Sequence, residues 1–388
     1  MTDSSEIDVP YLLDILKKMV SIDSILPHEQ RLAEFIAEEI RAMGIEPQWH
    51  EVAPGRPNVY ASADLGSVDK FLVFSGHSDT VDVASAWETD PFELTERNGR
   101  LYGLGTFNMK GGLACALAAF RALIQAKHLH GNLGQLGFAM TVDQDGCSIG
   151  AKALLETRYG RCDAMLHAEH FYGDSETDYL PIVGTGKILY KMTVQGRAAH
   201  GNRPHLGINA VTDASRIVAA LDRLRLREHP LFGRGTVCVL KIDGGYKQYS
   251  VVVPEHCEVI INRLTVPGET KAIVIEDIQE LINSLELQSK VIIETPLPFY
   301  DPYFLDHGPP ILSTFREVYQ QVLGKEPHFA GHVGITDANV FVGEGNIPTI
   351  VCGPKGANHH MAGEFVESAT LEPVAKIYVE TACRYFSC

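Results

Sequence analysis

The chain has 388 residues, of which 45% are hydrophobic, and it carries a formal net charge of -16. This length exceeds what one hydrophobic core usually serves, so we expect two domains with enough apolar residues to fill both. The negative charge excludes nucleic acid and anionic membranes as expected partners, because both are bound through an excess of lysine and arginine.

The eight cysteines form no CxxC pair and follow no regular spacing. The N-terminal stretch MTDSSEIDVP has neither the basic start nor the apolar run of a signal peptide. No apolar run reaches the length of about 18 residues that indicates a membrane helix. We therefore expect a reduced, cytoplasmic protein without a membrane span.

In the first half of the chain, helical and strand patterns alternate. Apolar residues recur at helical spacing in two early stretches, the second of which ends at Gly44, and later apolar runs suit buried strands. Helices are predicted at 11–20, 31–43 and 109–125, and strands at 71–80, 133–146 and 163–170. A helix between two such strands indicates βαβ units and a parallel sheet.

The pattern changes near Gly184 to alternating strands with two amphipathic helices, and the earlier style resumes after residue 300. Strands are predicted at 187–196, 236–242 and 251–266, helices at 209–224 and 275–285, and a returning helix and strand at 311–324 and 347–354. We expect an α/β domain of residues 1–182 and 301–388, with a smaller α+β domain of residues 183–300 inserted into it.

Polar residues follow several of the predicted strands of the α/β domain. They are His77, Asp79, Asp145, Glu169 and His360. Imidazole and carboxylate groups suit zinc, and the carboxyl ends of parallel strands meet at one edge of a sheet. Each residue alone also fits an ordinary structural role. His77 and Asp79 lie two apart, so Asp79 could orient a ligating imidazole or simply cap a turn.

The chain carries a series of motifs in one order from residue 76 to residue 365. They read GHSDTVD, WETDPFELTERNGRLYGLGTFNMKGG, DQDGCSIGA, AEH, GRAAHGNRPHLGINA, VVVPEHCEVIINR, GITDA and HHMAGEF. This series resembles the co-catalytic zinc amidohydrolases that include acetylornithine deacetylase, succinyl-diaminopimelate desuccinylase, carboxypeptidase G and aminoacylase. The resemblance implies a zinc-peptidase-like catalytic domain with an inserted lid that pairs with its copy in a homodimer.

The resemblance also implies roles for individual residues. His77 and Glu169 would bind one zinc, and His360 and Asp145 the other. Position 108 corresponds to the aspartate that bridges both ions, and position 144 to the glutamate that acts as general base.

Outside the metal ligands, the implied catalytic residues are Asp79, beside His77, and His200. His200 matches a lid histidine that reaches the partner subunit's active site and stabilises the developing oxyanion. Positions implied to lie near the carboxylate of a small substrate are Arg263, Gly334, Thr336 and Asp337.

The chain departs from this pattern at the positions that matter most for hydrolysis. Asn108 replaces the bridging aspartate, Gln144 replaces the general base, Asp145 replaces a glutamate ligand, and Val251 replaces an asparagine that touches substrate. An amide has no usable basicity near neutral pH. Two divalent ions about 3.5–4 Å apart repel by on the order of 15–20 kcal/mol, so losing the bridging carboxylate disfavours the pair. We expect at most one zinc or other divalent metal per chain, or none.

Three interpretations remain open. The chain is a divergent amidohydrolase for a small N-acylated amino acid, a non-hydrolytic biosynthetic enzyme such as a lyase, cyclase or acyl transferase, or a binding homologue without catalysis. Asn108 and Gln144 are also the isosteric changes an experimenter would choose to inactivate an enzyme. Asp145 and Val251 are not such changes, so natural divergence is favoured.

Overall fold

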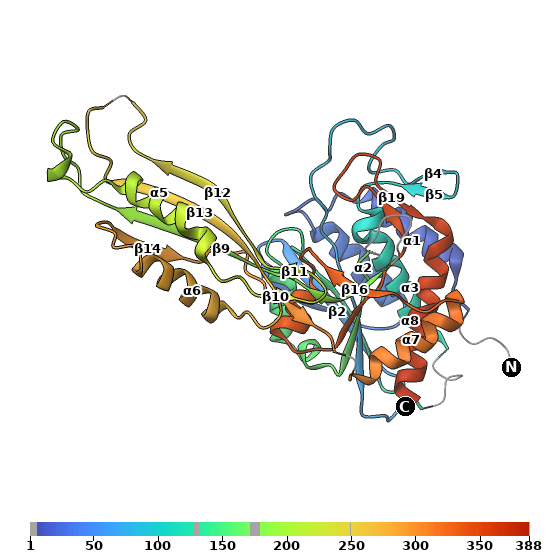
Figure 1. Ribbon diagram of the computed structural model, residues 1–388. Helices are drawn as coiled ribbons and strands as arrows, with labels where there is room; N and C mark the ends of the chain where they lie inside the picture. Colours follow the sequence, from blue (N-terminus) through green and yellow to red (C-terminus); the bar gives the residue numbers. More distant parts are fainter. Residues whose placement is uncertain (1–5, 127–131, 171–178, 249, 307, 388) are drawn as a thin grey trace. The chain divides into compact units, whose positions relative to one another are not determined.

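The computed structural model describes residues 6–126, 132–170, 179–248, 250–306 and 308–387 (Figure 1). Its residues form two compact units. Unit 1 comprises Met1–Ile182, Leu305–Ala330 and Thr336–Cys388, and unit 2 comprises Val183–Phe304 and Gly331–Ile335.

A six-stranded mixed sheet forms the centre of unit 1. Its order is β1 (Gln48–Ala53), β2 (Arg56–Asp64), β6 (Gln135–Thr141), β3 (Phe71–His77), β7 (Ala164–His167) and β17 (Thr349–Val351). Strand β3 runs parallel to β6 and β7, and β17 runs parallel to β7. The middle strands are mostly apolar and are buried except at the first residue of β3 and of β6, as expected for a sheet covered on both faces.

The helices of unit 1 are either amphipathic, with their apolar face buried, or apolar on most of their surface. They are α1 (Val9–Ser21), α2 (Gln30–Ala42), α3 (Gly111–Gln125), α4 (Ile149–Leu155), α7 (Pro310–Leu323) and α8 (Leu371–Ser387). The side chain of Asp8 caps α1 by accepting the N–H of Tyr11 at 3.0 Å. Helix α3 packs against α1, α8 and the sheet, and α7 packs against α8.

Helix α3 and the short helical turn before it, η1 (Thr106–Lys110), are long and apolar enough to cross a membrane by length and composition. Within the described residues no other stretch meets this test, and 83% of its apolar window is buried inside the protein. Such burial is typical of the core helix of a globular unit.

Smaller elements complete unit 1. A four-stranded sheet consists of β18 (Gly356–Ala357), β19 (Phe365–Glu367), β5 (Arg100–Tyr102) and β4 (Thr95–Arg97), and short helical turns lie at η2 (Arg158–Arg161), η5 (Asn339–Glu344) and η6 (Ser368–Thr370). The loop between β18 and β19 contains His360, with the backbone in the left-handed region at φ 61°.

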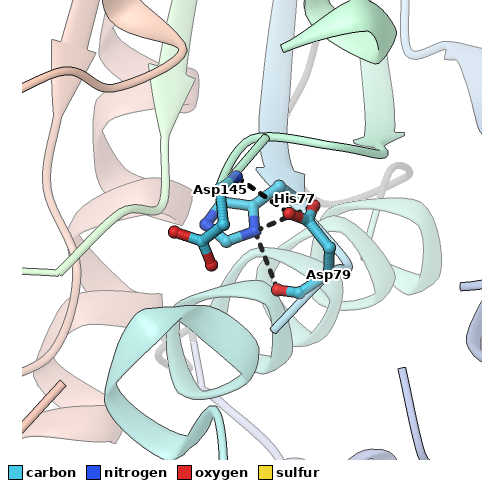
Figure 2. A group of neighbouring side chains, drawn as sticks. All are labelled: His77, Asp79 and Asp145. Carbon is cyan, nitrogen blue, oxygen red and sulfur yellow. Dashed lines mark hydrogen bonds and ion pairs between the residues drawn. The ribbon is translucent and has the colours of Figure 1, made fainter. Parts of the chain in front are cut away.

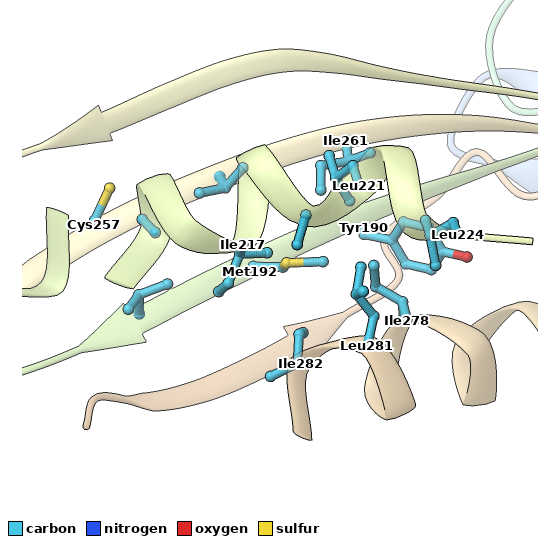
Figure 3. Packing of buried hydrophobic residues seen from close by; sticks show 14 of the residues in the cluster. Tyr190, Met192, Ile217, Leu221, Leu224, Cys257, Ile261, Ile278, Leu281 and Ile282 are labelled. Carbon is cyan, nitrogen blue, oxygen red and sulfur yellow. The ribbon is translucent and has the colours of Figure 1, made fainter. Parts of the chain in front are cut away.

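Unit 2 has a four-stranded antiparallel sheet with two helices against one face. The order is β12 (Thr236–Gly244), β13 (His256–Thr265), β9 (Gly186–Gln195) and β14 (Lys290–Glu294), and the helices are α5 (Ala210–Ala220) and α6 (Lys271–Asn283). Alternate residues of β9 and β13 are buried, which is the period of a sheet with one covered face. Tyr190, Ile217 and Ile278 are among the side chains of this core (Figure 3).

Unit 2 also contains the short elements β10 (Glu228–His229), β11 (Gly233–Arg234), η3 (Pro204–Leu206) and η4 (Leu221–Arg223). A three-stranded sheet consists of β15 (Tyr303–Phe304), β8 (Leu180–Gly184) and β16 (Phe329–His332), and the division between the units falls within β8 and β16. The structure extends this unit beyond the predicted 183–300. Tyr303 and Phe304 pair with Gly184 and Val183, and the carbonyl of His332 accepts the N–H of Thr185. These contacts join distant parts of the sequence, so local patterns did not indicate them.

Candidate metal centre

Three parallel strands deliver the predicted site residues to one edge of the unit 1 sheet. Strand β3 ends at His77, β6 ends at Thr141 just before residues 143–145, and β7 ends at His167 two residues before Glu169. His77 pairs in register with Thr141, which aligns the ends of β3 and β6. The common direction of these strands therefore gathers their polar ends in one place.

Asp79 holds the ring of His77. The Nδ1 of His77 lies 3.1 Å from the main-chain oxygen of Asp79 and 3.3 Å from its Oδ1 (Figure 2). The same carboxylate accepts the backbone N–H groups of Gln144 at 3.0 Å and Asp145 at 2.9 Å. Burial opposes the charged form of His77, but the carboxylates of Asp79 and Glu169 together outweigh it and raise the pKa of His77 well above its ordinary value. Asp79 thus fixes the direction in which His77 presents Nε2.

Glu169 is a buried carboxylate surrounded by imidazoles. Its Oε1 lies 3.7 Å from Nε2 of His77 and 3.5 Å from Nδ1 of His170, and its Oε2 lies 3.1 Å from Nε2 of His167. Burial works against ionisation, yet the hydrogen bonds from His167, His170 and His77 hold the pKa of Glu169 well below its ordinary value. Glu169 is therefore ionised and hydrogen-bonded.

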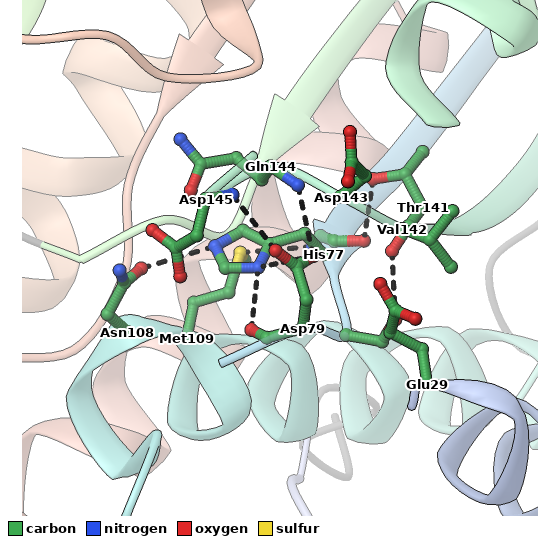
Figure 4. Close-up of polar contacts among 12 residues, drawn as sticks. Glu29, His77, Asp79, Asn108, Met109, Thr141, Val142, Asp143, Gln144 and Asp145 are labelled. Carbon is green, nitrogen blue, oxygen red and sulfur yellow. Dashed lines mark hydrogen bonds and ion pairs between the residues drawn. The ribbon is translucent and has the colours of Figure 1, made fainter. Parts of the chain in front are cut away.

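Asn108 lies between the two predicted half-sites. Its Oδ1 lies 3.2 Å from Nε2 of His77 (Figure 4), and its Nδ2 lies 3.0 Å from Nε2 of His360. The His360 ring in turn lies 3.1 Å from Oδ1 of Asp145. The hydrogen bond to Asp145 raises the pKa of His360 despite partial burial. One amide thus joins the two imidazoles that would hold separate metals.

The donor atoms around His77 fit a single divalent ion. In a tetrahedral zinc site with bonds of about 2.0–2.2 Å, two ligand atoms lie about 3.3–3.6 Å apart. His77 Nε2 is 3.2 Å from Asn108 Oδ1 and 3.7 Å from Glu169 Oε1. A second ion does not fit in the same way, because Asn108 turns its nitrogen toward His360 and an amide nitrogen has no free lone pair to offer. Donor atoms of His77, Asp79 and Asp145 also lie within 4.8 Å of one another.

Neither Gln144 nor Asp143, the two residues before Asp145, is placed to act as a base. Gln144 is buried and carries an amide, which takes no proton near neutral pH. Asp143 is buried and its Oδ1 accepts from Nη2 of Arg56 at 2.8 Å. Its Oδ2 accepts the backbone N–H of Cys147 at 2.9 Å. Both oxygens of Asp143 are therefore committed to protein donors.

The predicted substrate residues of unit 1 are buried beneath the strand ends. Asp337 is fully buried, and its Oδ2 accepts from Oγ1 of Thr141 at 3.0 Å. Burial raises the pKa of Asp337 to about 6. The hydroxyl of Thr336 accepts the N–H of Ala338 at 3.1 Å. These contacts hold the segment after β16 against the sheet.

The other predicted residues belong to unit 2. His200 is exposed, and its Nδ1 accepts the N–H of Asn202 at 3.1 Å. Arg263 is fully buried on β13, where Nη2 lies 2.6 Å from Glu269 and 3.0 Å from Asp277. Both ion pairs use Nη2, whereas Nε and Nη1 of Arg263 are buried without a hydrogen-bond partner among the described residues. The roles predicted for His200, Arg263 and Gly334 stay predictions.

Several residues near the site were not predicted from the sequence. His167 and His170 contact Glu169, and the ring centroids of His170 and His359 lie 4.8 Å apart. Glu364 accepts the backbone N–H groups of Gly105 at 2.8 Å, Phe107 at 3.0 Å and Asn108 at 2.8 Å. The sequence carried a signal for each, since His167 and His170 flank Glu169 and Glu364 lies in the HHMAGEF motif.

The chain was compared with known families, curated proteins and solved structures. The sequence model of the family described as peptidase family M20/M25/M40 matches residues 73–384. A protein of Staphylococcus epidermidis named probable succinyl-diaminopimelate desuccinylase is 26% identical over 398 residues, covering 94% of this chain and 95% of the relative. The succinyl-diaminopimelate desuccinylase of Magnetococcus marinus is 25% identical over 372 residues with the same coverage.

Solved structures share the fold across nearly the whole chain. The aminopeptidase PepT of Bacillus cereus has a TM-score of 0.78 at 19% identity, covering 97% of this chain and 98% of that one. The Sulfolobus solfataricus carboxypeptidase Sso-CP2 has a TM-score of 0.77 at 17% identity, covering 97% and 99%. The Bacillus subtilis YXEP protein, described as a dinuclear metal-binding peptidase, has a TM-score of 0.72 at 14% identity, covering 98% of each chain.

These matches confirm the resemblance seen in the motifs and the expected α/β fold. With most of its length matched, the chain belongs to peptidase family M20/M25/M40, whose members are metal-dependent peptidases and amidohydrolases.

Proposed function

We propose that this protein is a divergent amidohydrolase that binds at most one divalent metal and in which two-metal hydrolysis is impaired. The observation that carries the proposal is the orientation of Asn108. Its oxygen faces His77 and its nitrogen faces His360, so the bridging position offers one neutral ligand oxygen to one half-site only. Imidazole and carboxylate groups are among the ligands that zinc takes.

The residues of the site have distinct tasks in this proposal. His77, Asn108 and Glu169 hold the metal, which when bound polarises a carbonyl oxygen and acidifies water. Asp79 orients His77. Gln144 can position a water molecule through its amide but cannot take the proton that hydrolysis must remove. The proton-transfer step is therefore the one that this chain lacks.

The proposed substrate is a small N-acylated amino acid or a related molecule with a carboxylate. The support is the named activity of two relatives, each of which is a desuccinylase matched over 94% of this chain. We also propose that Arg263 and the segment Gly334, Thr336 and Asp337 serve the carboxylate, with Nε and Nη1 of Arg263, which have no partner among the described residues, available to donate.

We further propose a cytoplasmic homodimer formed through unit 2, with His200 acting in the partner subunit's site. Strand β12 is at the end of its sheet, so among the described residues one of its edges has no partner strand. Its side chains include Leu240 and Ile242, with 58% and 50% exposed. An apolar edge strand of this kind is a surface on which a second copy can pair.

A second candidate function is non-hydrolytic chemistry on the same scaffold, such as a lyase, cyclase or acyl transferase reaction. Two replacements favour it. Asn108 removes the bridging carboxylate and Gln144 removes the base that would deprotonate water, and both of these groups serve hydrolysis. His77 and Glu169 would still hold one metal for carbonyl polarisation. A binding homologue without catalysis is the third reading.

The test is turnover of N-acetyl, N-formyl and N-succinyl amino acids with zinc added. The unmodified protein should show negligible hydrolysis. The double variant Asn108→Asp with Gln144→Glu should hydrolyse at least one of these substrates, because it restores the bridge and the base together. Each single variant should gain little, since base and metal pair act as a unit. Brisk hydrolysis by the unmodified protein would contradict the proposal.

A further inference from the structure

Glu169 belongs to a second, buried group of polar side chains that the proposed function leaves unused. The hydroxyl of Ser75 lies 3.0 Å from Nδ1 of His167, and Nε2 of His167 lies 3.1 Å from Oε2 of Glu169. Ser75 and His167 are fully buried, and Glu169 is 1% exposed. Burying three polar side chains is unfavourable unless they form hydrogen bonds. Hydrogen bonds among Ser75, His167 and Glu169 therefore offset the cost of burying them.

The backbone explains why the three groups meet. Ser75 on β3 and His167 on β7 are register partners in neighbouring parallel strands, so their side chains lie on the same face of the sheet. Glu169 follows His167 by two residues and returns to that side. Phe341 packs its ring edge against His167 with the centroids 5.6 Å apart, which limits rotation of the imidazole.

The contact with Glu169 requires a proton on Nε2 of His167. The ionised carboxylate of Glu169 can only accept, so Nε2 of His167 carries the proton. In the neutral ring Nδ1 then accepts from the hydroxyl of Ser75. This arrangement commits Oε2 of Glu169 to the protein and leaves Oε1 toward His77, at 3.7 Å.

We infer that His167, set by Ser75, is a positioning residue that makes Glu169 a ligand through one oxygen. It does so by holding Oε2 away from the metal and directing Oε1 toward the position next to His77. This inference rests on the proposed single-metal site at His77 and Glu169. Groups that orient metal ligands in this way typically contribute 10- to 100-fold to metal affinity.

The experiment measures cobalt and zinc dissociation constants by competition with a chromophoric chelator, together with the cobalt absorption spectrum. His167→Leu fills the space without a donor and should weaken binding about 10- to 100-fold. His167→Gln places an amide N–H near the position of Nε2 and should restore affinity to within a few-fold. Thr349→Val removes a buried hydrogen bond to Ile347 in the same sheet and should bind as the unmodified protein does.

A purely structural role for His167 predicts a different pattern. In that case His167→Leu would bind metal with unchanged affinity and spectrum, or His167→Gln would be as weak as His167→Leu. Either result would overturn the inference. Should a variant fail to fold, Ser75→Ala serves in its place, because it leaves His167 present and removes only the group that sets its state.

A readout in the metal-free protein separates this inference from the proposed function. Nitrogen-15 spectra of labelled histidines should show His167 with its proton on Nε2, and Ser75→Ala should shift that signal. If the unmodified protein binds no metal, the proposed single-metal site is wrong. The spectrum still tests whether Ser75, His167 and Glu169 are hydrogen-bonded as described. A proton on Nδ1 alone would overturn the inference.

Discussion

The carboxylate of Asp143 is bound to the guanidinium of Arg56, with 2.8 Å between Oδ1 and Nη2. Asp143 directly precedes Gln144, so it is one of the two carboxylates adjacent in sequence to the missing base, the other being Asp145. Arg56 also pairs with the fully buried Glu29, so its guanidinium lies between the carboxylates of Glu29 and Asp143. The ion pair explains why Asp143 does not substitute for a glutamate at position 144.

Removing Arg56 should strongly destabilise the fold. Arg56→Met leaves Glu29 and Asp143 buried beside each other without a cation, and breaking a buried pair in this way typically costs about 3–5 kcal/mol. The free energy of unfolding, measured by urea denaturation, should fall by that amount. Arg97→Met, at an exposed pair with Glu88, should change it by less than about 1 kcal/mol. Equal losses in both variants would argue against the buried network.

Glu364 should give the fold a defined pH dependence. Burial raises the pKa of Glu364 from 4.5 to about 7, against the three backbone N–H groups that it accepts. Between these pH values the folded chain holds a proton that the unfolded chain has lost, so the free energy of unfolding falls as pH rises from about 4.5 to about 7. Below 4.5 the contribution is fully present.

The measurement for Glu364 is urea denaturation of the metal-free protein from pH 4 to pH 8, compared with Glu364→Gln. The amide cannot ionise, so the difference between the two proteins should change across this window by on the order of 3 kcal/mol. Parallel curves for the two proteins would show that Glu364 titrates normally.

The proposed dimer should depend on the free edge of β12. Ile242→Lys places a charge on that strand and should yield monomers at micromolar concentration in light scattering, whereas the unmodified chain should be a dimer. Trp49→Lys, at an exposed apolar residue of unit 1, should remain dimeric. If the unmodified protein is a monomer, both the proposed dimer and the proposed action of His200 in the partner subunit's site are wrong.

Much of the site followed from the sequence because it depends on local order. The apolar run that predicted a strand at 71–80 is β3, and the run at 163–170 contains β7, so His77 and Glu169 fell at strand ends as expected. Parallel strands then bring such ends together whatever the details of packing. The helix predicted at 109–125 is likewise α3, with η1 before it.

The remaining features depend on contacts between distant parts of the chain. Which way the Asn108 amide points is set by His77 and His360, which lie 31 and 252 residues away from it. Arg263 was expected near substrate, and its ion pairs with Glu269 and with Asp277 on α6, 6 and 14 residues further along the chain, were not predicted. Hydrophobic periodicity contains no information about such pairings, because it reports only which face of an element is covered.

The most direct test of the account is the number of zinc ions per chain after dialysis against excess zinc and removal of unbound metal, measured by mass spectrometry. The unmodified protein should retain no more than one, because Asn108 presents an oxygen to one half-site and a nitrogen to the other. Asn108→Asp should retain two, because a carboxylate offers an oxygen to each ion. Two zinc ions per chain in the unmodified protein would contradict the account.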